Sequence, residues 1–152
     1  MSTATIGPTA LPKRVSQRAA ANAGAAGFLA MAVFQVALAF GAPLGHAAWG
    51  GTYSALPGRL RAGSAVSAAI LILGALLILR TGGYPMLRIP LHASRWGTRL
   101  LSGGMALSAL ANFASASRWE RFLMGPIALL LAMLCLAVAR TASTSPDPTP
   151  TR

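Results

Sequence analysis

One uninterrupted apolar run constrains this chain more than any other feature. The segment AGSAVSAAILILGALLIL, residues 62–79, has no charged side chain and lies between Arg61 and Arg80. At about 1.5 Å per residue, a helix of this length approaches the roughly 30 Å thickness of a bilayer's hydrocarbon core. The flanking arginines can extend toward the headgroups. We therefore predict a membrane-spanning helix over residues 62–79.

Three further apolar segments predict three more spans. Residues 19–40 form the first, residues 100–116 the third, which is shorter and more polar, and residues 122–139 the fourth. A signal peptide is the alternative for the first segment, but the run exceeds the roughly 7–15 apolar residues of a signal core, and Gln35 interrupts it. The predicted fold is all-α, a transmembrane four-helix bundle with short loops that forms one domain over residues 19–140.

Composition supports a membrane location. Apolar residues make up 55% of the chain and charged residues only 10%, which is too apolar for an ordinary soluble domain. The net charge of +11 does not indicate nucleic-acid binding, because the arginines lie between apolar runs and not on one solvated face. We expect them at the headgroup level, where anionic lipids attract them. Residues 1–18 predict a flexible basic arm, and residues 141–152 predict a disordered tail.

The distribution of basic residues predicts the orientation of the chain. Nine of the thirteen Lys and Arg residues lie in residues 1–18, 80–99 and 140–152. By the positive-inside rule, both termini and the 80–99 connection are predicted to be cytoplasmic in a bacterial cytoplasmic membrane. Residues 41–61 and 113–121 are then extracytoplasmic. Because residues 41–61 are rich in glycine and proline, we expect them to fold back over the bundle and not to form one helix.

Two amide side chains, Gln35 and Asn112, lie within or at the end of predicted spans. An amide that faced lipid would leave hydrogen-bonding groups unsatisfied, so we expect both in the interior. We predict hydrogen bonds to backbone or to Ser108, a structural role, with ligand binding as the alternative. The single cysteine, Cys135, lies inside an apolar run and is interpreted as a packing residue.

The carboxylate of Glu120 is one of only two acidic side chains in the chain. Close to lipid and surrounded by arginines, it should stay ionised and accept charge-assisted hydrogen bonds. Arg118 and Arg121 are already its sequence neighbours, so we predict a clamp between Glu120 and Arg59 or Arg61 that holds the two extracytoplasmic connections together.

The functional alternative to this clamp is a small extracytoplasmic pocket. In that interpretation Glu120, Arg118 and His46 meet a polar ligand, and Trp49 and Trp119 form walls. The structural interpretation of both tryptophans is that they anchor the protein at the membrane interface. The candidate residues for a ligand site or a clamp are therefore His46, Trp49, Arg59, Arg61, Arg118, Trp119 and Glu120.

The two connections also resemble a known pattern. The stretches GAPLGHAAWGG and LPGRLR, followed much later by NFASASRWER, resemble small uncharacterised four-helix integral membrane proteins of bacteria. The resemblance covers mainly the two connections and the adjoining helix ends. It implies the four-span topology, and it transfers no functional residue because no activity is established for that family.

Several signatures of catalysis are missing from the sequence. There is no HExxH, no phosphate-binding GxxxxGK[ST] and no pair of carboxylates on one side, because Asp147 lies in the predicted cytoplasmic tail. His46 and His92 are predicted on opposite sides of the membrane, so we expect no metal and no cofactor. No predicted span contains Asp or Glu, which argues against transport coupled to protons or sodium.

Three functions remain open. The first is a non-enzymatic inner-membrane protein that acts by association with other membrane components, with membrane lipids, a membrane protein or a second copy as partner. The second is a small carrier or binder of a lipid-like or amphipathic molecule at the extracytoplasmic pocket. The third is a lipid- or isoprenoid-modifying enzyme with Glu120 or His46 as its acid or base.

Overall fold

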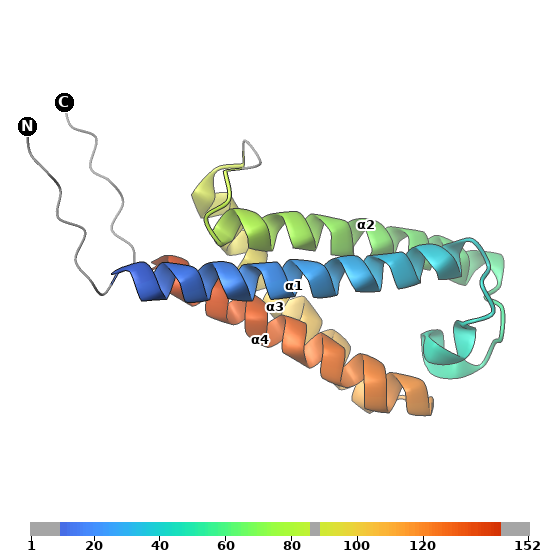
Figure 1. Cartoon of the computed structure of the whole chain (residues 1–152). Helices are drawn as coiled ribbons and strands as arrows, with labels where there is room; N and C mark the ends of the chain where they lie inside the picture. Colours follow the sequence, from blue (N-terminus) through green and yellow to red (C-terminus); the bar gives the residue numbers. More distant parts are fainter. Residues whose placement is uncertain (1–9, 86–88, 144–152) are drawn as a thin grey trace, which may run out of the picture.

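The computed structural model describes residues 10–85 and 89–143, and in these ranges it contains helices and no strands (Figure 1). The predicted all-α fold is confirmed. Two 3-10 turns lie between the first two long helices, and a π-helical turn precedes the last. The elements in order are α1 (Ala10–Ala39), η1 (Gly45–Ala47), η2 (Trp49–Gly51), α2 (Gly58–Thr81), α3 (Leu91–Phe113), η3 (Glu120–Met124) and α4 (Gly125–Ser143).

Three of the helical segments are long and apolar enough to cross a membrane. They are Val15–Ala39, Gly58–Thr81 and Glu120–Ala142. The third predicted span, residues 100–116, corresponds to α3, whose 23 residues give a length of about 35 Å but which is less apolar than the other three helices. Its first half carries basic and hydroxyl side chains, among them Ser94, Arg95, Thr98, Arg99 and Ser102.

The helix boundaries differ from the predicted spans at several points. α1 begins at Ala10, so that residues of the predicted basic arm from Ala10 onward are helical. Pro12 is compatible with this start, because the first N–H groups of a helix have no intrahelical partner. Residues 1–9 of the predicted arm lie outside the described residues.

The last two helices also extend beyond the predicted spans. α3 begins at Leu91, directly after Pro90, and ends at Phe113, so it starts within the predicted 80–99 connection. α4 continues to Ser143, three residues into the predicted tail. The remainder of that tail, residues 144–152, lies outside the described residues.

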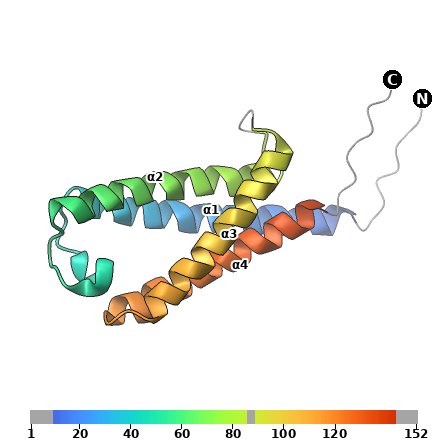
Figure 2. The same ribbon diagram turned by 180° about the vertical axis from the view of Figure 1, so that it is seen from behind.

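The four helices form two antiparallel pairs. α1 packs mainly against α2, and α3 packs mainly against α4. The two pairs diverge toward the end that holds η1 and η2 (Figures 1 and 2). We call this end, with residues 40–57 and 114–119, the loop end. The opposite end, where α1 and α3 begin and α2 and α4 end, is called the basal end.

The main core lies between α1, α2 and α4, on the basal side of the point where the pairs diverge. Lipid is as apolar as leucine, so close approach over small residues contributes much of the packing in a membrane. Gly24 illustrates this, because a Cβ there would come within 2.5 Å of Cδ1 of Ile78. The buried core residues are Ala21, Ala25, Phe28 and Ala32 of α1, Leu71, Ala75 and Ile78 of α2, and Leu131, Cys135 and Val138 of α4.

The connection between α1 and α2 folds back over the loop end, as predicted. Gly45 donates its N–H to the carbonyl of Ser54 at 2.9 Å, which closes the connection on itself. A second buried apolar cluster forms there from Leu38, Ala48 and Leu56. The connection is therefore a packed cap on the bundle.

Candidate functional site

Glu120 is the only acidic residue in residues 10–85 and 89–143, and it is buried, with 6% of its surface exposed. It lies in the first turn of the helical segment that continues into α4. A buried carboxylate requires hydrogen-bond partners. Its position at the loop end makes it the starting point of the candidate site.

The local sequence explains why this carboxylate points inward. Residues 117–120 read Ser-Arg-Trp-Glu, a pattern in which the serine caps a helix and the glutamate normally reaches back to the serine N–H. Ser117 Oγ does accept the N–H of Glu120, at 3.4 Å. The N–H of Ser117, however, is donated to Ser115 Oγ at 3.1 Å. The carboxylate is thereby released from the capping role.

A π-helical turn follows, over Glu120–Met124, in which the N–H of Gly125 reaches back to the carbonyl of Glu120. Pro126 provides a physical reason for the wider turn. Its ring has no N–H and would clash with the carbonyl of Phe122 in a regular α-helix. Single π turns of this kind are frequent at functional sites. Here the turn carries two inward-facing side chains, Glu120 and Met124.

The carboxylate of Glu120 connects the two loops, but not through an arginine. Its Oε1 accepts the N–H of Gly50 at 2.9 Å, and its Oε2 accepts the hydroxyl of Ser115. The prediction of an ion pair with Arg59 or Arg61 is wrong for the described structure. Arg59 is exposed, and Arg61 donates Nε to the carbonyl of Ala39 at 2.8 Å. A backbone N–H therefore occupies the position predicted for a guanidinium.

The backbone of residues 49–51 is what presents this N–H. The φ angles of Trp49, Gly50 and Gly51 are 54°, 82° and 73°, all in the left-handed region. Glycine adopts this region without strain, whereas Trp49 does so at a cost of roughly 1–2 kcal/mol. A Cβ at Gly51 would also come within 2.8 Å of the Cβ of Ser117. The two glycines thus allow the turn that reaches Glu120.

Further contacts hold this turn against both helix pairs. The indole Nε1 of Trp49 donates to Ser64 Oγ of α2 at 3.0 Å. The indole ring lies 2.9 Å from the position that a Cβ at Gly63 would occupy, so the glycine makes room for the ring. On the other side, Ser117 Oγ donates to the carbonyl of His46 at 2.7 Å. The turn therefore bridges α2 and the α3–α4 connection.

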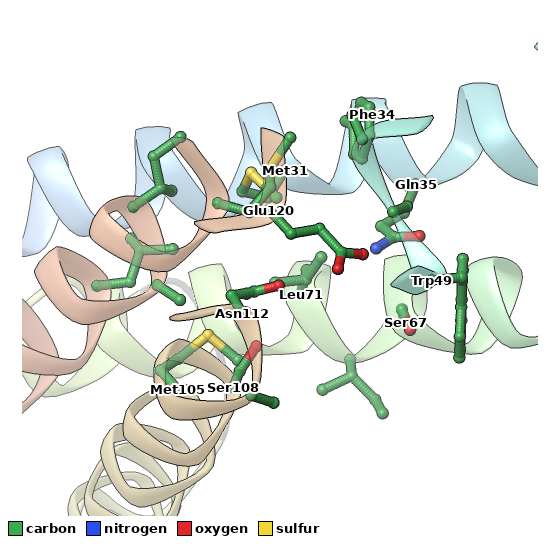
Figure 3. Close-up of a pocket in the computed structure, with 18 residues that line it drawn as sticks. Met31, Phe34, Gln35, Trp49, Ser67, Leu71, Met105, Ser108, Asn112 and Glu120 are labelled. Carbon is green, nitrogen blue, oxygen red and sulfur yellow. The ribbon is translucent and has the colours of Figure 1, made fainter. Parts of the chain in front are cut away.

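Behind this turn lies a cavity of about 450 Å³ between the two helix pairs (Figure 3). This volume falls within the range of small-molecule sites. All four helices contribute to its walls. Its apolar lining includes Met31, Phe34, Leu71, Met105, Met124 and Leu131, and its polar lining consists of Gln35, Trp49, Ser67, Ser108, Asn112 and Glu120.

Gln35 is the most informative of the polar residues. Its Oε1 is buried and has no hydrogen-bond partner, so the predicted structural hydrogen bonds are not formed by this atom. Figure 3 shows the side chains of Gln35 and Glu120 pointing toward one another, with the amide nitrogen of Gln35 on the side of the carboxylate and Oε1 on the opposite side. The residue lines the cavity, and this buried oxygen has an unused capacity to accept a hydrogen bond.

The predicted pocket is only partly assembled. Glu120 and Trp49 line the cavity, together with Gln35 and Asn112. Arg118 and Trp119 are exposed and do not line it. His46 is also exposed, and its Nδ1 donates to the carbonyl of Gly51 at 3.0 Å, which gives it a role in the turn.

Within the described residues, no group of three His, Cys, Asp or Glu side chains could hold a metal ion. Glu120 is also the only titratable side chain that lines the cavity. The cavity lining can therefore form hydrogen bonds with a ligand and attract a positive charge, within walls that are mostly apolar.

Comparisons with known proteins show no similarity from which a function could be transferred. No family model matches the chain, and neither a curated protein nor a solved structure matches it.

Proposed function

We propose that this protein is an integral membrane protein that binds an amphipathic molecule in the cavity at its loop end. The proposal includes all four helices crossing the membrane, with both termini cytoplasmic, and the loop end on the other side of a bacterial cytoplasmic membrane. The observation that carries it is the cavity of about 450 Å³ with a buried carboxylate and a buried, unpartnered amide oxygen in its walls.

The lining indicates the polar end of the ligand. Glu120 has neutral hydrogen-bond donors as partners, Gly50 N–H and Ser115 Oγ, so its negative charge has no cation beside it in the described structure. Gln35 Oε1 adds an acceptor without a donor. In surroundings of low dielectric, a ligand that carries both a positive charge and an N–H group is favoured. A protonated amine fulfils both conditions.

The remaining walls fit an apolar body. Methionines from α1, α3 and the π turn adapt to irregular shapes, and the ring of Phe34 adds an aromatic surface. Ile70 of α2 and Ala111 of α3 line the cavity and are exposed, which places an opening between these two helices. In a bilayer this opening would face lipid, so an amphipathic molecule can enter from the membrane.

This proposal moves ahead of association with other membrane components, which the sequence favoured. A bundle whose only task is association gains nothing from an unfilled cavity with a buried polar atom, because such an atom costs stability. Binding is also preferred to catalysis. General acid–base chemistry on a lipid would use two positioned groups, and Glu120 is the only titratable one in the lining.

The test uses the intrinsic fluorescence of Trp49. The Trp96→Phe, Trp119→Phe variant leaves Trp49 as the only one of the three tryptophans. In uncharged detergent, this protein is titrated with ten-carbon chains that carry bromine as a quencher and end in an amine, an alcohol or a carboxylate. We expect the amine to bind about tenfold more tightly than the alcohol, and the carboxylate most weakly.

The matched variants are Glu120→Gln and Asp147→Asn, which neutralise the two acidic residues of the chain one at a time. Glu120→Gln should reduce the amine's affinity to that of the alcohol, and Asp147→Asn should leave it unchanged. Gln35→Leu, which removes no hydrogen bond of Oε1, should also weaken the binding of the amine. It replaces Glu120→Gln as the test if that variant fails to fold. Equal binding of all three probes, or an amine affinity unaffected by both cavity variants, would refute the proposal.

A further inference from the structure

The basal end contains a second, smaller cavity of about 190 Å³ whose walls are rich in guanidinium groups. Arg18 of α1, Arg80 of α2 and Arg95 of α3 line it, together with Gln17 and Thr81. Figure 2 shows that the beginning of α1, the end of α2 and the beginning of α3 meet at this end. Three helices that are separate in sequence thus bring three positive charges to one place.

These charges have no carboxylate beside them in the described part of the chain. Its only acidic residue, Glu120, lies at the loop end. Two of the arginines are held by other contacts. Arg80 donates Nε to the carbonyl of Ile89 at 3.0 Å, and the guanidinium of Arg18 lies 5.3 Å from the centre of the Tyr84 ring. Neither contact supplies negative charge.

Arg95 is different, because its Nε is buried and has no hydrogen-bond partner. A buried N–H that belongs to a charged group is expensive to leave unpaired. An anion in the cavity could supply an oxygen that accepts this hydrogen, and it would place negative charge beside the three guanidinium groups. Arg95 Nε therefore marks the position where an acceptor is missing.

Hydrogen bonds join the three helices that carry these arginines. Thr81 Oγ1 lies 2.7 Å from Ser94 Oγ and 2.9 Å from Thr98 Oγ1, so a buried hydroxyl cluster joins the end of α2 to the beginning of α3. Gln17 Nε2 donates to the carbonyl of Thr81 at 3.0 Å and adds α1 to this frame. Because the helices are held in this way, little backbone ordering remains to be done when a ligand binds.

We propose that the basal cavity binds a phosphate group. Guanidinium groups match the geometry of phosphate oxygens and can donate two hydrogen bonds in parallel. The cavity is smaller than most sites for whole small molecules, which suits a single charged group. It also lies at the end of the apolar helices, the depth at which the phosphates of anionic lipids are found. The phosphate is either that of a lipid headgroup or free phosphate.

The experiment measures the thermal unfolding midpoint of the full chain in uncharged detergent. The additions are phosphatidylglycerol, diacylglycerol, which has no phosphate, and inorganic phosphate, each titrated separately. If only phosphatidylglycerol raises the midpoint, the ligand is a lipid headgroup. If inorganic phosphate raises the midpoint equally, the ligand is free phosphate. Equal responses to phosphatidylglycerol and diacylglycerol, or no response to any addition, would overturn the proposal.

The matched variants are Arg95→Gln and Arg59→Gln. Both remove one positive charge, but Arg59 is exposed at the loop end. Arg95→Gln should weaken the binding of the phosphate compound by about tenfold or more, and Arg59→Gln should leave it unchanged. Arg95→Lys keeps the charge but not the paired donors, and we expect an intermediate loss. An equal effect of Arg95→Gln and Arg59→Gln would show that only net charge matters and would refute a specific site.

Discussion

At the loop end the buried atom without a partner is an acceptor, Oε1 of Gln35, whereas at the basal end it is a donor, Nε of Arg95. No other buried side-chain nitrogen or oxygen is unpartnered among the residues whose side chains are described. Each of the two atoms belongs to a residue that lines a cavity. This difference is the basis for the two proposals, a site for a cation at the loop end and a site for an anion at the basal end.

The two ends also differ in how their charged groups are held. At the loop end, the carboxylate of Glu120 depends on a turn with positive φ angles and on the N–H of Gly50. At the basal end, hydroxyl groups between regular helices fix the frame. Changes to the turn should therefore alter the loop end alone.

The largest effect is expected from Gly51→Ala. The substitution places a Cβ at a φ of 73° and within 2.8 Å of the Cβ of Ser117. The combined cost of backbone strain and overpacking is about 3 kcal/mol. The measurement is the free energy of unfolding in detergent titrated with a denaturing surfactant.

Gly50→Ala is the matched control for this prediction. Its φ is 82°, but a Cβ there would meet nothing within 4 Å, and the N–H that Glu120 accepts is retained. It should cost about 1 kcal/mol, from backbone strain alone. Equal costs for the two glycines would contradict the close contact between the turn and Ser117.

A smaller effect, of opposite sign, is expected when either unpartnered atom is removed. Gln35→Leu and Arg95→Met each replace a buried group without a partner by an apolar group of similar length. Each should raise the stability of the ligand-free protein by about 1 kcal/mol, because no hydrogen bond of that atom is lost.

Each of these variants is the control for the other. Gln35→Leu should weaken the binding of the amine probe and leave the response to phosphate compounds unchanged. Arg95→Met should weaken the response to phosphate compounds and leave the binding of the amine probe unchanged. The readouts are unfolding free energy and the two binding titrations. A loss of stability on Gln35→Leu would mean that the amide has a structural role, as the sequence analysis preferred.

Much of the fold could be predicted because it follows from length and polarity. An 18-residue apolar run between Arg61 and Arg80 leaves few alternatives to a long helix, and α2 covers it. Residues 41–61 were predicted from their glycines and prolines to fold back over the bundle; residues 41–57 do so, whereas residues 58–61 begin α2. The start of α3 at Leu91 was missed because its basic and hydroxyl residues are typical of a membrane surface. The structure instead buries Ser94 and Thr98 in the hydroxyl cluster.

The candidate site could be predicted only in part. The sequence indicates that Glu120 joins two connections, since it is a scarce carboxylate between polar loops. Its partner could not be derived from side-chain charges, because the donor is the backbone N–H of Gly50. The Ser-Arg-Trp-Glu pattern at residues 117–120 was an available signal for a helix start at Ser117. The cavity itself depends on the divergence of the helix pairs, for which no local pattern exists.

The smallest expected effect is the coupling between Glu120 and Arg61. The two side chains have different partners, Gly50 N–H for the carboxylate and the carbonyl of Ala39 for the guanidinium. In a double-mutant cycle of Glu120→Gln with Arg61→Gln, the changes in unfolding free energy caused by the two single substitutions should add to within about 0.5 kcal/mol. The cycle of Glu120→Gln with Ser115→Ala is the positive control, because the Ser115 hydroxyl donates to the carboxylate. There we expect a coupling of about 1 kcal/mol. A coupling of that size with Arg61 would restore the ion pair, supply the carboxylate with a cation from the chain itself, and remove the reason for a cationic ligand at the loop end.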